Sequence, residues 1–248
     1  MIGELVSEMR GVVDDARGRE DASGYFAAMY LGVTTTVERG LADGRFTTPD
    51  RLSRLTSAFA RRYLDALALH RGGGSPTESW QLAFHTARTW RPTVLQHLLL
   101  GMNAHINLDL GIACVAVAPG PEIVELEPDF VQINSVLAGL VQEVQDRLNR
   151  VSPLYRFVDD VAGDADRAVV NFSIARARSE AWRFATELAS MDTSTAAQRM
   201  AEQDRTVSRF GTRILRPGPL AATGLLAVRV TERRNRSAII DILSGAAP

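Results

Sequence analysis

The 248-residue sequence contains no lysine, and all 28 of its basic residues are arginine. Without lysine, the chain cannot form a lysine Schiff base or build the lysine-containing P-loop that holds nucleotide phosphates. The one cysteine, Cys114, excludes a disulfide within the chain and any zinc site made of several thiolates. We interpret Cys114 as a small buried apolar residue.

Neither sign of charge is in excess, because 28 basic and 29 acidic residues leave a formal net charge of −1. A nucleic acid or an anionic membrane recognised through the bulk charge of the protein is therefore not an expected partner. The first 21 residues also lack the basic start and the long apolar run of a secretory signal. We expect a cytoplasmic protein without a nucleic-acid partner.

Apolar residues recur at helical spacing along most of the chain, and a regular alternation of strands with helices is missing. A capping box at residues 75–78, Ser-Pro-Thr-Glu, predicts the start of one helix. Residues 225–230 fit either a short strand or a helix, and we favour the helix. The sequence predicts a single all-α domain over residues 1–248, a bundle of eight or nine helices around a buried central helix.

The longest apolar run, residues 94–119, predicts that central helix. Its length would suit a membrane span, but its polar side chains would be costly in lipid, so we expect no span. Those side chains are Gln96, His97, Asn103, His105, Asn107 and Asp109. Four-residue spacing places one set of residues on a single helix stripe: His97, Gly101, His105 and Asp109. Gly101 either opens space beside the stripe or lets another helix approach closely.

The pair His105 and Asp109 allows three interpretations. It is a buried hydrogen-bonded pair that fixes helix packing, or two ligands of a metal ion, or an imidazole oriented by a carboxylate for acid–base work. A metal site would need a third ligand, for which His97 and His85 are the candidates. We interpret the acidic residues between 159 and 166 as a solvated turn between helices.

Three further polar residues are candidates for ligand binding. Asn103 and Asn107 form a second pair at four-residue spacing on the opposite side of the central helix, where they bind either a ligand or a neighbouring helix. Arg178 belongs to a later predicted helix. It pairs with a buried carboxylate such as Asp109, stacks on Trp182, or faces solvent.

The segment HLLLGMNAHINLDLG, preceded by WRPTVLQ and FARRYLDAL, resembles an uncharacterised family of bacterial and fungal proteins of unknown function. The resemblance runs over most of the chain and includes YFAAMYLGVTTTV, DFVQIN and RARSEAW. It implies that the polar residues of the central helix belong to the signature stretch of the family: His97, Asn103, His105, Asn107 and Asp109. It implies no activity.

A shorter segment, LGMNAHINLD, is similar to the zinc-binding helix of bacterial zinc-dependent phospholipases C and P1-type nucleases, which carry LGxxxHxxxD. Those proteins are also all-α, and the similarity implies that His105 and Asp109 bind zinc. The chain departs from the pattern elsewhere. Val115 stands where a further histidine is expected, no second HxxxE motif follows, and no N-terminal tryptophan is present. The similarity therefore implies at most a reduced metal site.

Two functions follow from these observations. The first is a metal-assisted hydrolase of the phosphoester type, in which a divalent ion such as zinc activates water against a small-molecule substrate. Its metal ligands would be His105, Asp109, His97 and His85, its catalytic groups His97, His105 and Asp109, and its substrate-binding groups Asn103, Asn107 and Arg178. The second is a non-catalytic helical module that binds an apolar small molecule or a partner protein, with His105–Asp109 as a structural pair.

Overall fold

The computed structural model describes residues 2–157 and 174–246, and within them the side chains of 134–141, 156–157 and 220 are not described. The first range contains α1 (Ile2–Gly18), α2 (Gly24–Ala42), α3 (Pro49–Arg71), α4 (Glu78–Ala87), α5 (Val94–Ala104), the π-helix η1 (His105–Asp109), α6 (Leu110–Val117), the 3₁₀-helix η2 (Gly120–Leu126), α7 (Glu127–Val151) and the 3₁₀-helix η3 (Pro153–Phe157). The second contains α9 (Ile174–Ala189), α10 (Thr193–Leu215), α11 (Pro219–Thr231) and α12 (Arg236–Ser244).

The prediction of an all-α chain is confirmed, since the described ranges contain no strand. The predicted number of helices is wrong, because residues 2–157 and 174–246 alone contain eleven α-helices instead of eight or nine. The long central helix is divided by η1, and the tail is two helices because the chain turns after Thr231. Residues 225–230 lie inside α11, as favoured above. The acidic turn expected at 159–166 lies outside the described residues.

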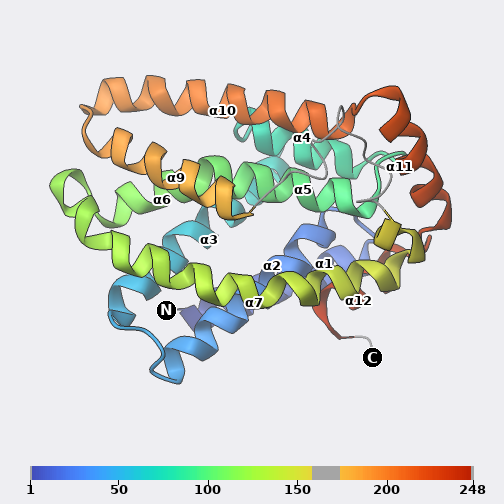
Figure 1. Ribbon diagram of the computed structural model, residues 1–248, viewed down its shortest axis with the longest axis horizontal. Coiled ribbons are helices and arrows are strands. Elements are labelled where there is room, and N and C mark those ends of the chain that lie inside the picture. Colours follow the sequence, from blue (N-terminus) through green and yellow to red (C-terminus); the bar gives the residue numbers. More distant parts are fainter. Residues whose placement is uncertain (1, 158–173, 247–248) are drawn as a thin grey trace.

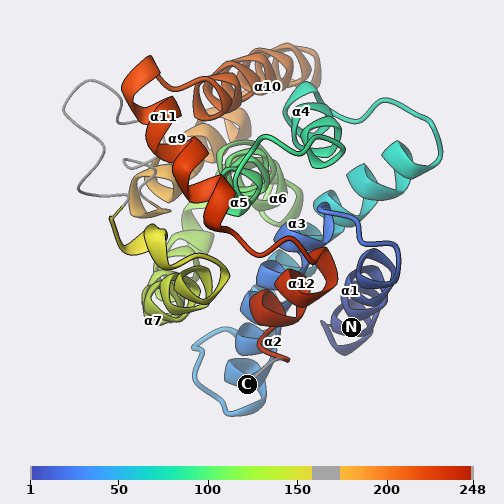
Figure 2. The same cartoon turned by 90° about the vertical axis from the view of Figure 1, so that its right-hand side faces the viewer.

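The central helix passes through the middle of the bundle. In Figure 2, α5 and α6 are seen nearly along their axis, with α4, α10, α3 and α9 around them. Figure 1 shows α10 along one side of the molecule and α2 with α12 on the opposite side. The run from Val94 to Val117 is long and apolar enough to cross a membrane, but 72% of its apolar window is buried by the surrounding helices. Its hydrophobicity is thus explained by its position in the core.

The predicted capping box at the start of α4 does not form. Thr77 is the N-cap residue, and its side chain makes no capping hydrogen bond. The carboxylate of Asp204 on α10 instead accepts hydrogen bonds from the backbone N–H groups of Glu78 (2.7 Å) and Ser79 (3.0 Å). These N–H groups have no partner within their own helix, so a buried carboxylate from a distant helix satisfies them.

Two glycines let helices pack unusually close to the central helix. A Cβ on Gly101 would lie 2.5 Å from the ring of Phe26 on α2. Gly101 therefore permits close approach, and the ring of Phe26 fills the space beside the stripe. A Cβ on Gly111 would lie 2.5 Å from the ring of Phe184 and 3.1 Å from the carbonyl oxygen of Ala181, so it would press on the backbone of α9.

We predict that Gly111→Ala lowers the free energy of unfolding by about 2 kcal/mol, because the new methyl group overpacks the α6–α9 contact. The gain in helix propensity, about 1 kcal/mol, offsets part of this cost. Urea unfolding followed by circular dichroism measures the change.

Gly11→Ala is the matched control. Gly11 is exposed in α1, and a Cβ there meets nothing within 4 Å. This substitution should stabilise the protein by about 0.5–1 kcal/mol through helix propensity alone. Equal stabilisation by both alanines would show that α6 and α9 are not closely packed at Gly111.

Candidate functional site

The carboxylate of Asp109 connects three parts of the bundle. Its Oδ1 accepts a hydrogen bond from Nε of Arg62 on α3 (3.1 Å), and its Oδ2 accepts one from Nε1 of Trp80 on α4 (2.8 Å). Nδ1 of His105 lies 3.2 Å from the same Oδ2. Asp109 is fully buried, so these three donors replace water around the carboxylate. We call Asp109, His105, Arg62 and Trp80 the Asp109 cluster.

His105 and Asp109 are the first and last residues of the π-helix η1. The backbone N–H of Leu110 donates to the carbonyl of His105, the i to i+5 bond that widens this turn. The wider turn leaves the carbonyl of Asn107 open to Nε2 of Gln203 on α10, at 3.0 Å. π-helical turns are rare and frequently lie at functional sites, so this segment marks where the central helix is adapted to its polar residues.

The imidazole of His105 is enclosed by aromatic rings. Phe59 stacks on it with ring centroids 3.6 Å apart and an interplanar angle of 6°, and Tyr30 meets it edge-on at 4.5 Å. Burial lowers the pKa of His105, and the hydrogen bond to Asp109 opposes that shift only in part. The ring is therefore neutral near pH 7. Its proton belongs on Nδ1, where it is donated to Asp109.

The other ring nitrogen of His105, Nε2, is buried and has no hydrogen-bond partner among the described residues. The same holds for the hydroxyl oxygens of Tyr30, Thr56 and Tyr63. Burial raises the pKa of both tyrosines, which keeps them protonated. The rings of Tyr30 and Tyr63 lie 4.5 and 6.3 Å from the ring of His105, so the Asp109 cluster adjoins two protonated phenols.

His97 and His85 do not join the Asp109 cluster. His97 is buried on α5 against the edge of Tyr25, with ring centroids 5.7 Å apart. Burial, followed by the positive charges of Arg229 and Arg236, lowers its pKa to about 3. His85 is exposed on α4 and faces His70 at 5.5 Å. In residues 2–157 and 174–246, no group of three or more His, Cys, Asp or Glu side chains could hold a metal ion.

The asparagine pair connects the central helix to α10. Nδ2 of Asn103 donates to the carbonyl of Val207 (2.9 Å), and Nδ2 of Asn107 donates to Oδ1 of Asn103 (2.9 Å). Asn103 is buried, so its amide serves helix packing in this arrangement. Of the two roles considered for the pair, the observed contacts match attachment to a neighbouring helix.

Arg178 lies apart from the Asp109 cluster, whose arginine is Arg62. Its guanidinium is buried on α9, 4.5 Å above the centre of the Phe130 ring, and Nη2 donates to the carbonyl of Phe130 at 3.0 Å. Burial lowers its pKa to about 10. Trp182 packs against the Phe130 ring, with the two ring centroids 4.8 Å apart.

The sequence reasoning missed Arg62 and Trp80. They precede Asp109 by 47 and 29 residues, and no spacing rule connects positions so far apart. The sequence contains one usable signal, because Trp80 is a polar-tipped residue on the apolar side of its helix and its buried N–H needs an acceptor.

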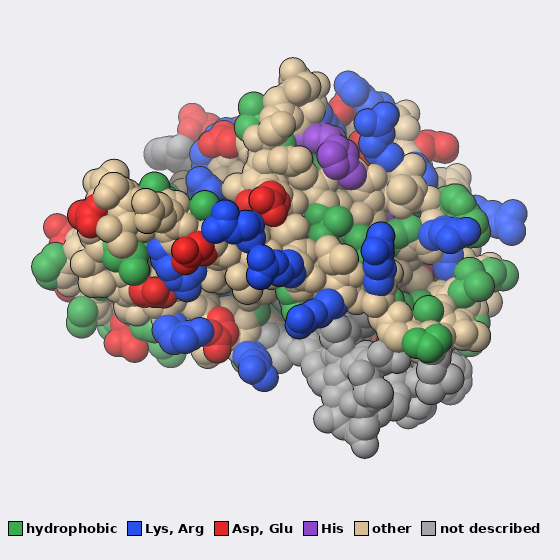
Figure 3. Space-filling view, turned by 90° about the horizontal axis from the view of Figure 1, so that it is seen from above, with side chains coloured by type: hydrophobic (Ala, Val, Ile, Leu, Met, Phe, Trp, Pro, Cys, Tyr) green, Lys and Arg blue, Asp and Glu red, His purple; other side chains and the backbone are tan. Residues whose placement is uncertain are grey.

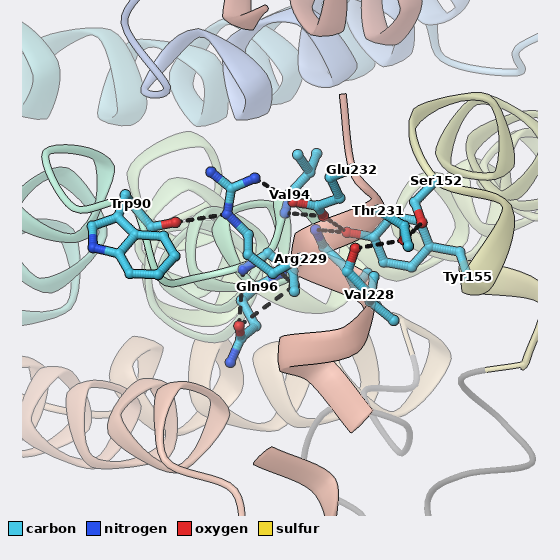
Figure 4. Close-up of polar contacts among 11 residues, drawn as sticks. Trp90, Val94, Gln96, Ser152, Tyr155, Val228, Arg229, Thr231 and Glu232 are labelled. Atoms are coloured by element: carbon cyan, nitrogen blue, oxygen red, sulfur yellow. Dashed lines mark hydrogen bonds and ion pairs between the residues drawn. The ribbon is translucent and has the colours of Figure 1, made fainter. Parts of the chain in front are cut away.

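A second buried polar network, also missed, surrounds Glu232 at the start of α5 (Figure 4). One carboxylate oxygen, Oε1, accepts from the backbone N–H of Val94 (2.7 Å) and from the hydroxyl of Tyr155. The other, Oε2, lies 3.0 Å from Nη1 of Arg229. Nε of Arg229 also donates to the carbonyl of Trp90, at 2.6 Å. Glu232 therefore attaches the N-terminus of the central helix to α11 and to η3.

Burial raises the pKa of Glu232, while its hydrogen bonds to Tyr155 and Val94 and the charge of Arg229 act in the opposite direction. The same burial, together with the neighbouring carboxylate, raises the pKa of Tyr155 well above its usual value. The Glu232 carboxylate thus accepts a hydrogen bond at the N-terminus of α5, as the Asp204 carboxylate does at the N-terminus of α4.

We predict that Asp109→Ala lowers the free energy of unfolding by about 3–5 kcal/mol, because it leaves Arg62 and two buried N–H donors without their acceptor. Trp80→Phe removes one donor and should cost about 1 kcal/mol from the hydrogen bond. Asp65→Ala, at an exposed position of α3, is the control and should change stability by less than about 0.5 kcal/mol. Urea unfolding measures all three. Equal midpoints for Asp109→Ala and Asp65→Ala would contradict the structural role of the cluster.

We also predict a pH dependence of stability from His97. Its pKa falls from the usual 6.5 to about 3 on folding, so the folded protein binds this proton more weakly than the unfolded chain. The contribution of neutral, buried His97 to the free energy of unfolding is therefore complete above pH 6.5. It is lost as the pH falls from there toward 3, at up to about 1.4 kcal/mol per pH unit. His97→Gln should therefore reduce the slope of unfolding free energy against pH between these limits. An unchanged slope would show that His97 is accessible to protons in the folded state.

Comparison with known proteins identifies the family. No curated protein and no solved structure matches the chain. A family of unknown function (DUF5995) matches residues 2–217, which include the Asp109 cluster and the π-helix but not Glu232. The similarity to zinc-dependent phospholipases C has no counterpart among these matches. The chain is a member of the DUF5995 family of unknown function.

Proposed function

We propose that this protein is a non-catalytic helical module that acts by binding a partner, and that His105 and Asp109 form a structural pair. The observation that carries the proposal is the set of contacts that Asp109 already makes inside the fold. Both of its oxygens accept hydrogen bonds from side chains on other parts of the fold, and the carboxylate is buried. A metal ligand or a general base needs a lone pair directed at an open position.

The packing around Gly101 also supports binding at the surface over binding of an apolar molecule inside the bundle. The cavity there has a volume of about 20 Å³ and is lined by residues that include Phe26, Tyr63, Trp80 and His97. This is about the volume that one water molecule needs, whereas small-molecule sites occupy roughly 300–1,000 Å³. An apolar ligand would have to displace the ring of Phe26 from the Gly101 position.

A metal-assisted hydrolase is the second candidate, and one observation favours it. Nε2 of His105 is free while Asp109 orients Nδ1, which is the arrangement of a histidine prepared to bind a metal or accept a proton. His97 and His85 do not fit the remaining ligand positions, because one faces Tyr25 and the other is exposed on α4. The described residues around His105 therefore do not complete a set of metal ligands.

Metal content distinguishes the two candidates. We predict that tag-free protein carries far less than one zinc, iron or manganese per chain, and that adding these ions leaves the melting temperature unchanged. Elemental analysis and thermal unfolding check this for the wild type, His105→Ala and Asp109→Asn.

The surface pair His70 and His85 requires its own control, because their rings lie 5.5 Å apart and can bind metal adventitiously. Metal that His85→Ala loses and His105→Ala keeps belongs to that pair and leaves the proposal intact. Near-stoichiometric metal that is lost in both Asp109→Asn and His105→Ala would replace the proposed module with a metalloenzyme.

A further inference from the structure

The charge of this nearly neutral protein is distributed unevenly. Between Asp204 and Asp241 the sequence contains eight arginines and a single acidic residue, Glu232. The arginines are Arg205, Arg209, Arg213, Arg216, Arg229, Arg233, Arg234 and Arg236. Because Glu232 is buried and shared with Arg229 and Tyr155, it neutralises little of this charge at the surface. The net charge of −1 thus conceals a strongly basic region.

Part of this charge forms a row along α10. Arg205, Arg209 and Arg213 follow at four-residue spacing and so lie on one side of the helix, about 6 Å apart along its axis. These three and Arg216, just past the helix end, are exposed. None of the four has an ion-pair partner in the described parts of the chain. We call them the arginine row. Figure 3, which looks onto this side of the molecule, shows arginine side chains gathered along its middle.

Exposed apolar side chains gather where the arginine row ends. Trp90 is 61% exposed, Leu226 52% and Val230 65%, and they make up half of the large exposed hydrophobic residues described. Leu226 and Val230 lie one turn apart on α11, and Arg229 between them bonds to the carbonyl of Trp90. These three residues are the apolar end.

The arginine row and the apolar end are neighbours in space. Arg216 directly follows α10, α11 begins three residues later at Pro219, and Leu225 of α11 belongs to the same core cluster as Ile214 of α10. Figure 1 shows α11 continuing from the end of α10 over the adjoining end of the molecule. The arginine row therefore ends where the helix that carries Leu226 and Val230 begins.

We propose that the arginine row and the apolar end together dock the protein on an anionic phospholipid surface. Guanidinium groups bind lipid phosphates through charge-assisted hydrogen bonds, and tryptophan with aliphatic side chains is favoured at the boundary between headgroups and acyl chains. The phosphates of a nucleic acid could also pair with the arginine row. They would offer no apolar surface for Leu226 and Val230 to contact. The exposed apolar residues therefore favour a phospholipid surface over a nucleic acid as the partner.

This inference names the partner of the proposed binding module, but it uses none of the residues of the Asp109 cluster. Its test is therefore independent of the metal analysis, and either proposal can fail alone. The earlier expectation of no anionic-membrane partner concerned bulk charge, whereas here a local surface of a protein with net charge −1 makes the contact.

Sedimentation of the full chain with vesicles tests the proposal. Wild type should bind vesicles of phosphatidylcholine with roughly one-third phosphatidylglycerol, bind pure phosphatidylcholine at least about tenfold more weakly, and dissociate as salt is raised. Arg209→Glu with Arg213→Glu should weaken binding by about tenfold or more. Trp90→Ser with Leu226→Ser should also weaken it, and should lower the fraction that stays bound at high salt.

Arg39→Glu with Arg54→Glu is the matched control, since both arginines are exposed on α2 and α3, away from α10. This variant should bind like the wild type. Thermal unfolding verifies that all variants are folded, which is expected because the substituted side chains are exposed.

Three results would overturn the proposal. The first is failure of the wild type to bind anionic vesicles even at low salt, and the second is an equal loss of binding in the control variant. The third is tight binding to duplex DNA that depends on Arg209 and Arg213 but not on Trp90 and Leu226, which would identify a nucleic-acid surface instead.

Discussion

A carboxylate at the centre of a helical bundle is tolerated only when donors surround it, and Asp109 has three. They come from α3, α4 and the first residue of η1, so the position of each of these elements depends on the same two oxygen atoms. The aromatic rings around His105 exclude water from this contact, which strengthens every hydrogen bond inside it and penalises the loss of any one. The most polar point of the central helix is thereby the point that fixes how its neighbours pack.

The same solution recurs at the helix ends. Asp204 on α10 accepts hydrogen bonds from the first N–H groups of α4, and Glu232, just past α11, accepts one from the N–H of Val94 at the start of α5. Each carboxylate lies more than 120 residues away in the sequence from the helix whose N–H groups it satisfies. A local cap would define only where a helix begins. These distant carboxylates also define which helices lie beside it, and being buried they penalise any arrangement that leaves them without donors.

Much of the fold could be predicted from the sequence because helical periodicity is a local property. The all-α class, the buried helix at residues 94–117 and the pairing of His105 with Asp109 all follow from spacings of three and four residues. Arg62 and Trp80 could not be predicted as partners of Asp109, because their contact is formed by packing between helices far apart in the sequence. The π-helical turn at His105–Asp109 was equally inaccessible, since one added residue in a turn leaves the apolar pattern almost unchanged.

The position of Glu232 has a consequence for where the folding unit ends. The family match stops at residue 217, yet α12 contributes Ile239, Ile240, Ile242 and Leu243 to the largest core cluster. Ile240 packs against Gly24, where even a methyl group would lie only 2.7 Å from its side chain. A protein shortened to the matched segment would lose both this packing and the acceptor for Val94. The boundary of sequence similarity is therefore not a structural boundary, and a self-contained fragment has to extend through Ser244.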